Sequence, residues 1–256
     1  MGAGHAHALY VHGHSRVHLM APEAKVAGAL AFVVVVALTP PRAAWAFAAH
    51  AAVLAVVIRL ARLRPGFVAT RATVALPFLA FAFFIPFIAT GERTELLGVS
   101  VSAEGLIAAR TILSKALIGV TVSIVLAATT ETPAIMRGLS RLRVPVIFTT
   151  IATFMIRYLE TLVGELGRMR TAMTARGYDP RWLWQARPIA NGAGALFIRS
   201  YERGERVHAA MVARGFDGTM PVLDDRRASS GEWLAVAALP AIAAMATVTT
   251  MLLVAP

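Results

Sequence analysis

The chain has 256 residues, of which 57% belong to the hydrophobic class and only 15% are charged. A soluble domain carries about 25% charged residues, so this composition excludes an ordinary water-soluble globule and predicts an integral membrane protein. The net charge of +11 favours basic cytoplasmic loops over nucleic-acid binding, and the absence of cysteine excludes disulfides, thiolate metal sites and cysteine nucleophiles.

Five stretches are apolar enough to cross a bilayer, which takes about 20 residues, or fewer where flanking long side chains reach the interface. In chain order they are residues 26–39, 43–58, 71–92, 105–130 and 233–256. The third contains Pro77 and Pro86, which predict kinks. Arg110 and Lys115 lie near the start of the fourth, and we expect them to anchor it at the interface.

The loops between these stretches alternate in charge. Residues 59–71 hold four arginines and no acid, whereas residues 92–104 hold three glutamates and one arginine. Basic loops lie on the cytoplasmic side of the membrane, and the basic loop 59–71 follows the second span. The amino terminus, two spans earlier, is therefore expected to be cytoplasmic as well. The first residues are rich in His and Gly and lack a short apolar core, so we expect no cleavable signal peptide.

A sixth apolar run, residues 144–156, ends at Arg157 and Glu160. A charge near the bilayer centre costs about 2.5 to 3.5 kcal/mol on insertion scales, which disfavours a longer span through both. A crossing here would also place the arginine-rich stretch 168–227 outside. We therefore expect residues 144–163 to form an interfacial or internally buried helix, and residues 143–231 to be cytoplasmic.

That region contains a repeated octad, Ala-Met-Thr-Ala-Arg-Gly-Tyr-Asp at 172–179 and Ala-Met-Val-Ala-Arg-Gly-Phe-Asp at 210–217. Each glycine supplies the left-handed residue that ends a helix, so each arginine is expected on a last helical turn, next to small and flexible side chains. Arginines there often only complement the helix dipole and face water. Arginine and aromatic side chains also anchor protein interfaces, and two copies suit a partner with two similar sites.

These motifs resemble the signature of the transmembrane T component of energy-coupling factor (ECF) transporters. In that family each Ala-Arg-Gly motif ends a long coupling helix and docks into one of two ATP-binding cassette ATPase subunits. The resemblance implies that the ATPase-coupling residues are Ala175, Arg176, Gly177, Ala213, Arg214 and Gly215. The neighbouring side chains expected to support this interface are Met173, Tyr178, Met211 and Phe216.

Within that family the chain is most similar to the CbiQ type of the cobalt branch, through its amino-terminal histidines and through Pro22 and Lys25 before the first span. Imidazole binds Co(II), Ni(II) and Zn(II), but no Asp, Glu or Cys accompanies these histidines. They are weak candidate metal ligands: His5, His7, His12, His14 and His18. His50, inside the second span, is explained equally well by a functional role or by a helix–helix hydrogen bond.

The resemblance implies a non-catalytic coupling subunit of an ATP-driven importer in the bacterial cell membrane. It would bind no cofactor itself, with ATP and Mg on the ATPases and cobalt(II), for cobalamin biosynthesis, as cargo. Its partners would be the two ATPases, a CbiM-like substrate-binding S component, a small accessory membrane subunit and lipids. The sequence has no G-x-x-x-x-G-K-[ST] motif, so we expect no P-loop ATP site in this chain.

The expected fold is an all-α integral membrane protein with about five transmembrane helices and long crossing cytoplasmic coupling helices. Its regions are a His-rich segment (1–24), a four-helix transmembrane region (25–130), interfacial and coupling helices (131–231) and a last span (232–256). Two alternatives stay open. One is a T component for nickel or a vitamin, and the other is a polytopic enzyme acting on lipids, for which the sequence lacks a carboxylate cluster.

Overall fold

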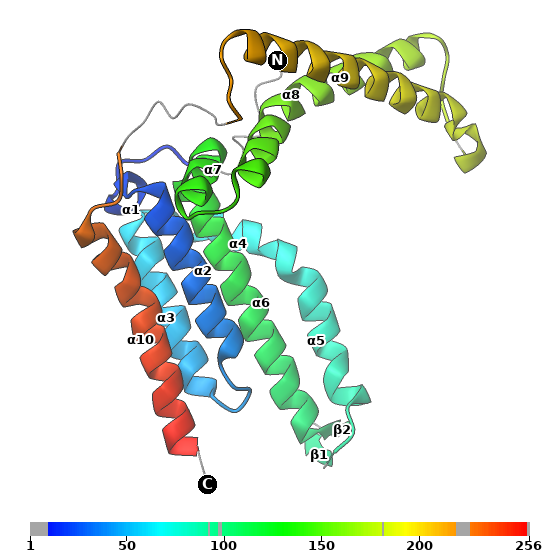
Figure 1. Cartoon of the computed structure of the whole chain (residues 1–256). Coiled ribbons are helices and arrows are strands. Elements are labelled where there is room, and N and C mark those ends of the chain that lie inside the picture. Colours follow the sequence, from blue (N-terminus) through cyan, green and yellow to red (C-terminus); the bar gives the residue numbers. More distant parts are fainter. Residues whose placement is uncertain (1–9, 92, 97–98, 181, 219–225, 255–256) are drawn as a thin grey trace. The chain divides into compact units, whose positions relative to one another are not determined.

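The computed structural model describes residues 10–91, 93–96, 99–180, 182–218 and 226–254 (Figure 1). These residues fall into two compact units. Residues 10–142 and 226–254 form the bundle unit, and residues 143–218 form the hairpin unit.

The bundle unit consists of helices and one short antiparallel β-hairpin. Figure 1 shows α2, α3, α6 and α10 side by side, and α5 packs mainly against α6. In chain order the elements are α1 (Arg16–Leu19), α2 (Pro22–Leu38), α3 (Ala44–Leu60), α4 (Pro65–Ala72), the 3-10 turn η1 (Thr73–Ala75), α5 (Leu76–Ile88), β1 (Arg93–Leu96), β2 (Val99–Ser102), α6 (Ala103–Thr129), α7 (Thr132–Arg141) and α10 (Ser230–Val254).

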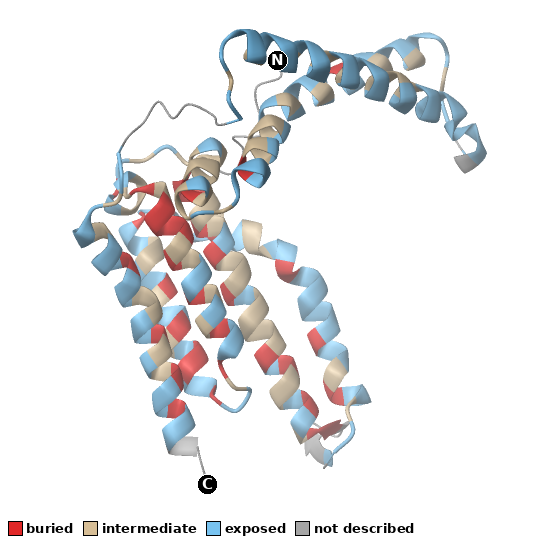
Figure 2. Cartoon of the chain, viewed as in Figure 1, coloured by how far each residue is buried: buried red, intermediate tan, exposed pale blue. Residues whose placement is uncertain are grey.

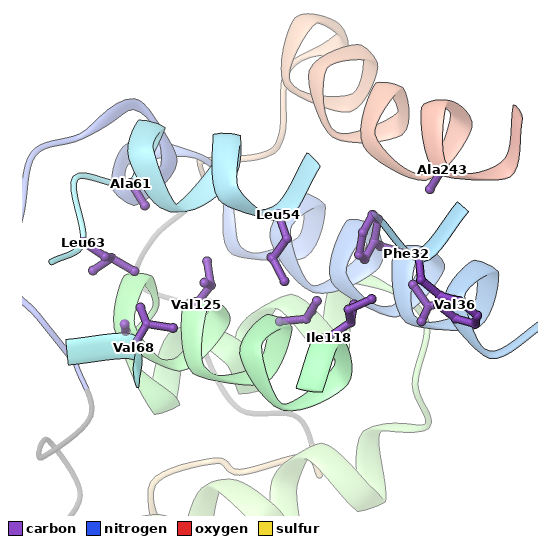
Figure 3. Packing of buried hydrophobic residues seen from close by; sticks show 12 residues of the cluster. Phe32, Val36, Leu54, Ala61, Leu63, Val68, Ile118, Val125 and Ala243 are labelled. Atoms are coloured by element: carbon purple, nitrogen blue, oxygen red, sulfur yellow. The ribbon is translucent and has the colours of Figure 1, made fainter. Parts of the chain in front are cut away.

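The apolar core of the bundle unit lies where α2, α3, α6 and α10 meet (Figure 3). Its members are Phe32, Val36, Phe47, Leu54, Ala61, Leu63, Val68, Ile118, Val122, Val125, Ala128 and Ala243. Helix α2 approaches α10 so closely that a Cβ atom at Gly28 would lie 2.1 Å from Cγ1 of Val236. Figure 2 shows the buried residues on the inward faces of the helices and exposed residues on the outward faces, as expected where lipid covers the outside.

A polar group lies inside this core. His50 is fully buried, and its Nε2 atom lies 3.1 Å from the carbonyl oxygen of Ala243 and 3.3 Å from Oγ1 of Thr247. The hydroxyl of Thr39 lies 3.2 Å from that of Thr247. His50 therefore links α3 to α10 by a helix–helix hydrogen bond, one of the two explanations that the sequence left open.

The two cations in α6 bind main-chain oxygens in the last turn of α2 and in the turn that follows it. Lys115 donates to the carbonyl oxygen of Ala37 at 2.6 Å, and Arg110 donates to that of Pro41 at 2.9 Å. The last carbonyl groups of a helix lack partners within the helix and attract positive charge. Arg110 and Lys115 thus satisfy main-chain oxygens in addition to any role as interface anchors.

Among the described residues, four helical segments are long and apolar enough to cross a membrane: Pro65–Ile88, Ala103–Thr129, Val146–Ala175 and Ser230–Leu252. Ala44–Leu60 is a shorter apolar helix. The expected all-α membrane architecture is therefore confirmed. In the third expected span, η1 interrupts the helix just before Pro77, and Pro86 lies near the end of α5. The β1–β2 hairpin, which joins α5 to α6, was not expected from the sequence.

The expectation for residues 144–163 needs correction. Residues 146–163 belong to one continuous 30-residue helix, α8 (Val146–Ala175), that runs through Arg157 and Glu160 without a break. Only 6% of the most apolar 18-residue stretch of α8 is buried within the structure. The expectation that this segment is buried inside the chain was therefore wrong. Helix α7, at the start of the region expected at 131–231, packs on α2 within the bundle unit.

Candidate functional site

The hairpin unit consists of α8 and α9 (Arg187–Ala213), joined by a turn that contains the 3-10 segment η2 (Leu183–Ala186). The two helices lie side by side in Figure 1 and run antiparallel. A Cβ atom at Gly192, near the start of α9, would lie 3.0 Å from Cε of Met173, near the end of α8. Because the helices are antiparallel, Arg176 and Arg214 lie at opposite ends of the hairpin.

A buried carboxylate holds the two helices together. Glu165 of α8 is 8% exposed and forms ion pairs with Arg199 at 3.5 Å and with Arg203 at 3.3 Å, both on α9. An ion pair that is shielded from water resists screening more than a surface pair does. From the sequence Glu165 could be placed only on a helix face. Its two partner arginines are more than 30 residues away, and no local pattern predicts that they pair with it.

The first motif ends α8 with a Schellman cap. Arg176 is the C-cap residue of the helix, and Gly177 after it has a φ of 79°. The amide of Gly177 donates to the carbonyl oxygen of Thr174 at 3.0 Å, and that of Tyr178 donates to Met173 at 3.1 Å. This pair of hydrogen bonds defines the Schellman geometry, in which glycine tolerates the left-handed conformation best.

The second motif repeats this cap at the end of α9. Arg214 is the C-cap residue, and Gly215 has a φ of 84°. The amide of Gly215 donates to Val212 at 2.9 Å, and that of Phe216 donates to Met211 at 3.0 Å. The two sequence copies are therefore two copies of one local structure, as the glycine positions predicted.

Both caps present the same surface. The Ala, Arg and Gly residues of each motif are exposed, whereas the Met and the aromatic residue of each cap are half-buried. A Cβ atom at either glycine would meet no atom within 4 Å. The surface beside each glycine is thus open, whereas the methionine and the aromatic residue of each cap are partly covered.

The two caps differ in how they are attached to the rest of the chain. The hydroxyl of Tyr178 donates to the carbonyl oxygen of Gln185, which fastens the first cap to the inter-helix turn. In that turn the indole rings of Trp182 and Trp184 stack at 5.0 Å with an interplanar angle of 6°, and both are exposed. Phe216 has no hydroxyl group, so the second cap lacks this bond. The tryptophan pair was not among the site residues predicted from the sequence.

The amino-terminal histidines show no metal site in the part of the chain that the structure describes. His5 and His7 lie outside the described residues. Nε2 of His18 lies 3.0 Å from the carbonyl oxygen of Val11, and its Nδ1 lies 2.7 Å from the hydroxyl of Ser15, so both ring nitrogens are engaged. Across the described residues no group of three or more His, Cys, Asp or Glu side chains is arranged to hold a metal ion. Metal binding by His12 and His14 stays a prediction.

Comparison with known proteins gives concordant matches. Residues 13–223 match the model of the CbiQ family, described as cobalt transport protein. The cobalt transport protein CbiQ of Rhodobacter capsulatus is 32% identical over 167 residues, which are 62% of this chain and 68% of the relative. A putative fused cobalt transport protein CbiMQ of Methanocorpusculum labreanum is 24% identical over 174 residues, 65% of this chain but only 29% of that longer protein. An uncharacterized protein of Methanocaldococcus jannaschii is 29% identical over 121 residues, 47% of this chain and 41% of the relative. Since the family model covers most of the chain, including both motifs, the chain belongs to the CbiQ family of cobalt transport proteins.

Proposed function

We propose that this chain is the membrane coupling subunit of an ATP-driven, ECF-type cobalt importer. The observation that carries the proposal is the pair of equivalent helix caps, each with an exposed arginine, at the two ends of one antiparallel hairpin. A repeated surface of this kind fits a partner that offers the same groove twice, as a pair of related ATPase subunits does.

The distance between the caps suits two separate partner subunits. Helix α9 has 27 residues. At 1.5 Å per residue its ends are about 40 Å apart, too far for one small groove to receive both arginines. Each guanidinium group can form charge-assisted hydrogen bonds with acidic side chains of its own ATPase. When two ATPases approach each other on binding ATP, they would carry both ends of the hairpin with them, which is rigid-body transmission.

Exposed apolar side chains on α8 are a reason to expect a partner within the membrane. Ile147, Phe148, Ile151 and Met155 lie in the first half of the helix and are exposed. Such side chains need cover from lipid or from an apolar protein surface. The fused CbiMQ relative supports a CbiM-like partner as the source of such a surface. We propose that this partner is the S component that binds the cargo, with a small accessory membrane subunit alongside.

Under this proposal the chain is non-catalytic, lies in the cell membrane with a cytoplasmic amino terminus, and binds neither ATP nor Mg itself. Cobalt(II) is the proposed cargo. Nickel or a vitamin is the alternative, and the cargo-binding partner would decide between them. Imidazole and amine ligands bind both Co(II) and Ni(II). The choice of metal therefore depends on the cargo-binding partner and is little restricted by the coupling subunit.

The test is co-expression of the tagged chain with its genomic neighbours, followed by purification in detergent and assay of cobalt uptake. The double variant Arg176→Ala/Arg214→Ala should insert normally but lose ATPase association or uptake. The matched control is Arg170→Ala/Arg206→Ala, which removes exposed arginines of the same two helices outside the caps. An intact complex with normal uptake in the double motif variant would refute the coupling role.

A further inference from the structure

The two chain connections between the units are tied together inside the bundle unit. The chain leaves the bundle unit after Leu142 and enters it again at Arg226. Arg141, directly before the first connection, forms an ion pair of 3.2 Å with Glu23 in the first turn of α2. The same guanidinium Nη1 atom donates to the carbonyl oxygen of Arg226, directly after the second connection.

Glu23 is the centre of this arrangement. It is 4% exposed, and its Oε1 atom accepts the main-chain amide of Ala228 at 2.7 Å in addition to Arg141 at 3.3 Å. Its position at the start of α2 is favourable, because the positive end of a helix dipole stabilises a carboxylate. Glu23 thus holds α2, the end of α7 and the returning segment at one point.

A second carboxylate extends the tie to the last helix. Glu232, in the first turn of α10, pairs with Arg226 at 3.1 Å and accepts the amide of Ala21 at 3.1 Å. It also accepts the amide of Ser229 at 2.9 Å. We call Glu23, Arg141, Arg226 and Glu232 the return clasp.

Close packing fixes the clasp on its inner side. A Cβ atom at Gly138 of α7 would lie 3.0 Å from the main-chain nitrogen of Glu23, so α7 lies directly against the start of α2. This contact sets the position from which Arg141 reaches Glu23. The clasp therefore rests on packed helices, and its two arginines directly flank the chain connections.

We propose that Glu23 is the positioning residue through which movement of the hairpin unit reaches α2 and α10. The inference rests on the proposed coupling function. A loose connection would absorb a displacement of the hairpin by bending. The first connection consists only of residues 142–145, so a displacement at the start of α8 reaches Arg141 directly, and through Glu23 and Arg226 it reaches α2 and α10. Transmission through a packed and hydrogen-bonded element is the physical requirement for coupling two sites.

The first test uses the purified chain alone. Since the chain has no cysteine, Ser140→Cys and Arg227→Cys can carry spin labels on the two sides of the clasp. In the parent the distance distribution between the labels should be narrow, and in Glu23→Gln it should be at least twice as wide. The control is Glu202→Gln, which removes an exposed glutamate paired to Arg206 at 3.9 Å. An unchanged distribution in Glu23→Gln would overturn the clasp.

The second test uses the full complex and measures cobalt taken up per ATP hydrolysed. We expect Glu23→Gln to assemble and hydrolyse ATP within twofold of the parent, while uptake per ATP falls at least fivefold. Glu202→Gln should match the parent. A wider distance distribution with unchanged uptake per ATP in Glu23→Gln would overturn the positioning role. Loss of assembly in both Glu23→Gln and the milder Arg141→Lys would overturn it too. A parent chain that binds no ATPase would refute the proposed function instead, and the label experiment would still judge the clasp.

Discussion

Tyr178 donates its hydroxyl hydrogen to the carbonyl oxygen of Gln185, and Phe216, its counterpart in the second motif, has no such group. The two caps are therefore equivalent in main-chain geometry but unequal in attachment. The first is fastened to the turn that carries Trp182 and Trp184. This difference gives a physical reason to expect unequal effects when the two motifs are changed separately.

The first prediction concerns that attachment. Tyr178→Phe should loosen the turn while leaving the cap intact, because the main-chain bonds of the cap do not involve the hydroxyl. The lost hydrogen bond is worth about 1 kcal/mol, which corresponds to local opening that is about fivefold more frequent. Hydrogen exchange at the amide of Gln185, which donates to the carbonyl oxygen of Trp182 at 3.0 Å in this turn, should accelerate accordingly. Tyr201→Phe, at an exposed position of α9, is the control, and equal exchange rates in both variants would contradict the prediction.

The second prediction concerns the cap glycines. Gly177→Ala and Gly215→Ala should each destabilise the end of their helix by about 1 to 2 kcal/mol, because alanine is strained at positive φ. No atom lies within 4 Å of the added Cβ, so the cost is conformational and not steric. Hydrogen exchange at the amides of Tyr178 and Phe216 should rise.

The control for the glycine variants is Gly167→Ala, in the interior of α8, where a Cβ atom also meets nothing within 4 Å. Alanine there should stabilise the helix by about 0.5 to 1 kcal/mol, an effect of opposite sign. Destabilisation by Gly167→Ala as well would show that substituting any glycine of the hairpin is harmful and that the caps are not special.

The third prediction concerns the hairpin. Glu165→Gln removes both ion pairs to Arg199 and Arg203, and we expect a loss of about 1 to 2 kcal/mol, below the value for a fully buried pair because the arginines are partly exposed. Hydrogen exchange should increase along the facing parts of α8 and α9. Glu160→Gln, an exposed residue of the same helix, should change little. The same exchange pattern in both variants would remove Glu165 as the link.

The repeated caps could be predicted from the sequence because their causes are local. A glycine after the C-cap residue, a small residue before it and an aromatic residue beyond it determine the turn within eight positions. The spans could be predicted for a similar reason, since apolar length is a local property. Glu165 and Glu23 could not be assigned roles, because their partners lie far along the chain and no periodicity connects them.

The segment 144–163 was expected to be helical, and it is, but the charge argument did not show how far the helix extends. Counting charges disfavoured a longer membrane span through Arg157 and Glu160, and α8 passes both and continues to Ala175. The cost of a charge applies to a side chain at the bilayer centre and does not apply to a helix that extends beyond the membrane. Helix formation depends on main-chain hydrogen bonds and propensity, which these two residues do not disturb.

The fourth prediction concerns His18, whose Nε2 atom lies 3.0 Å from the carbonyl oxygen of Val11. The amide of Val11 in turn donates to the carbonyl oxygen of Ala128 in α6 at 3.0 Å, and we call the amino-terminal segment docked when this bond is formed. Burial lowers the pKa of His18 below its ordinary value of 6.5, and the positive charges of Lys25 and His14 act in the same direction, against the hydrogen bonds to Val11 and Ala128. The docked segment therefore binds a proton less readily than the undocked one. Above pH 6.5 both forms are neutral and stability is flat, whereas below it the undocked form gains the proton and docking weakens as the pH falls. Protection of the Val11 amide, corrected for intrinsic exchange, should thus be lower at pH 5.5 than at pH 7.5. His12→Gln should keep this dependence and His18→Gln should abolish it, and equal protection of the parent at both pH values would show that His18 does not control docking.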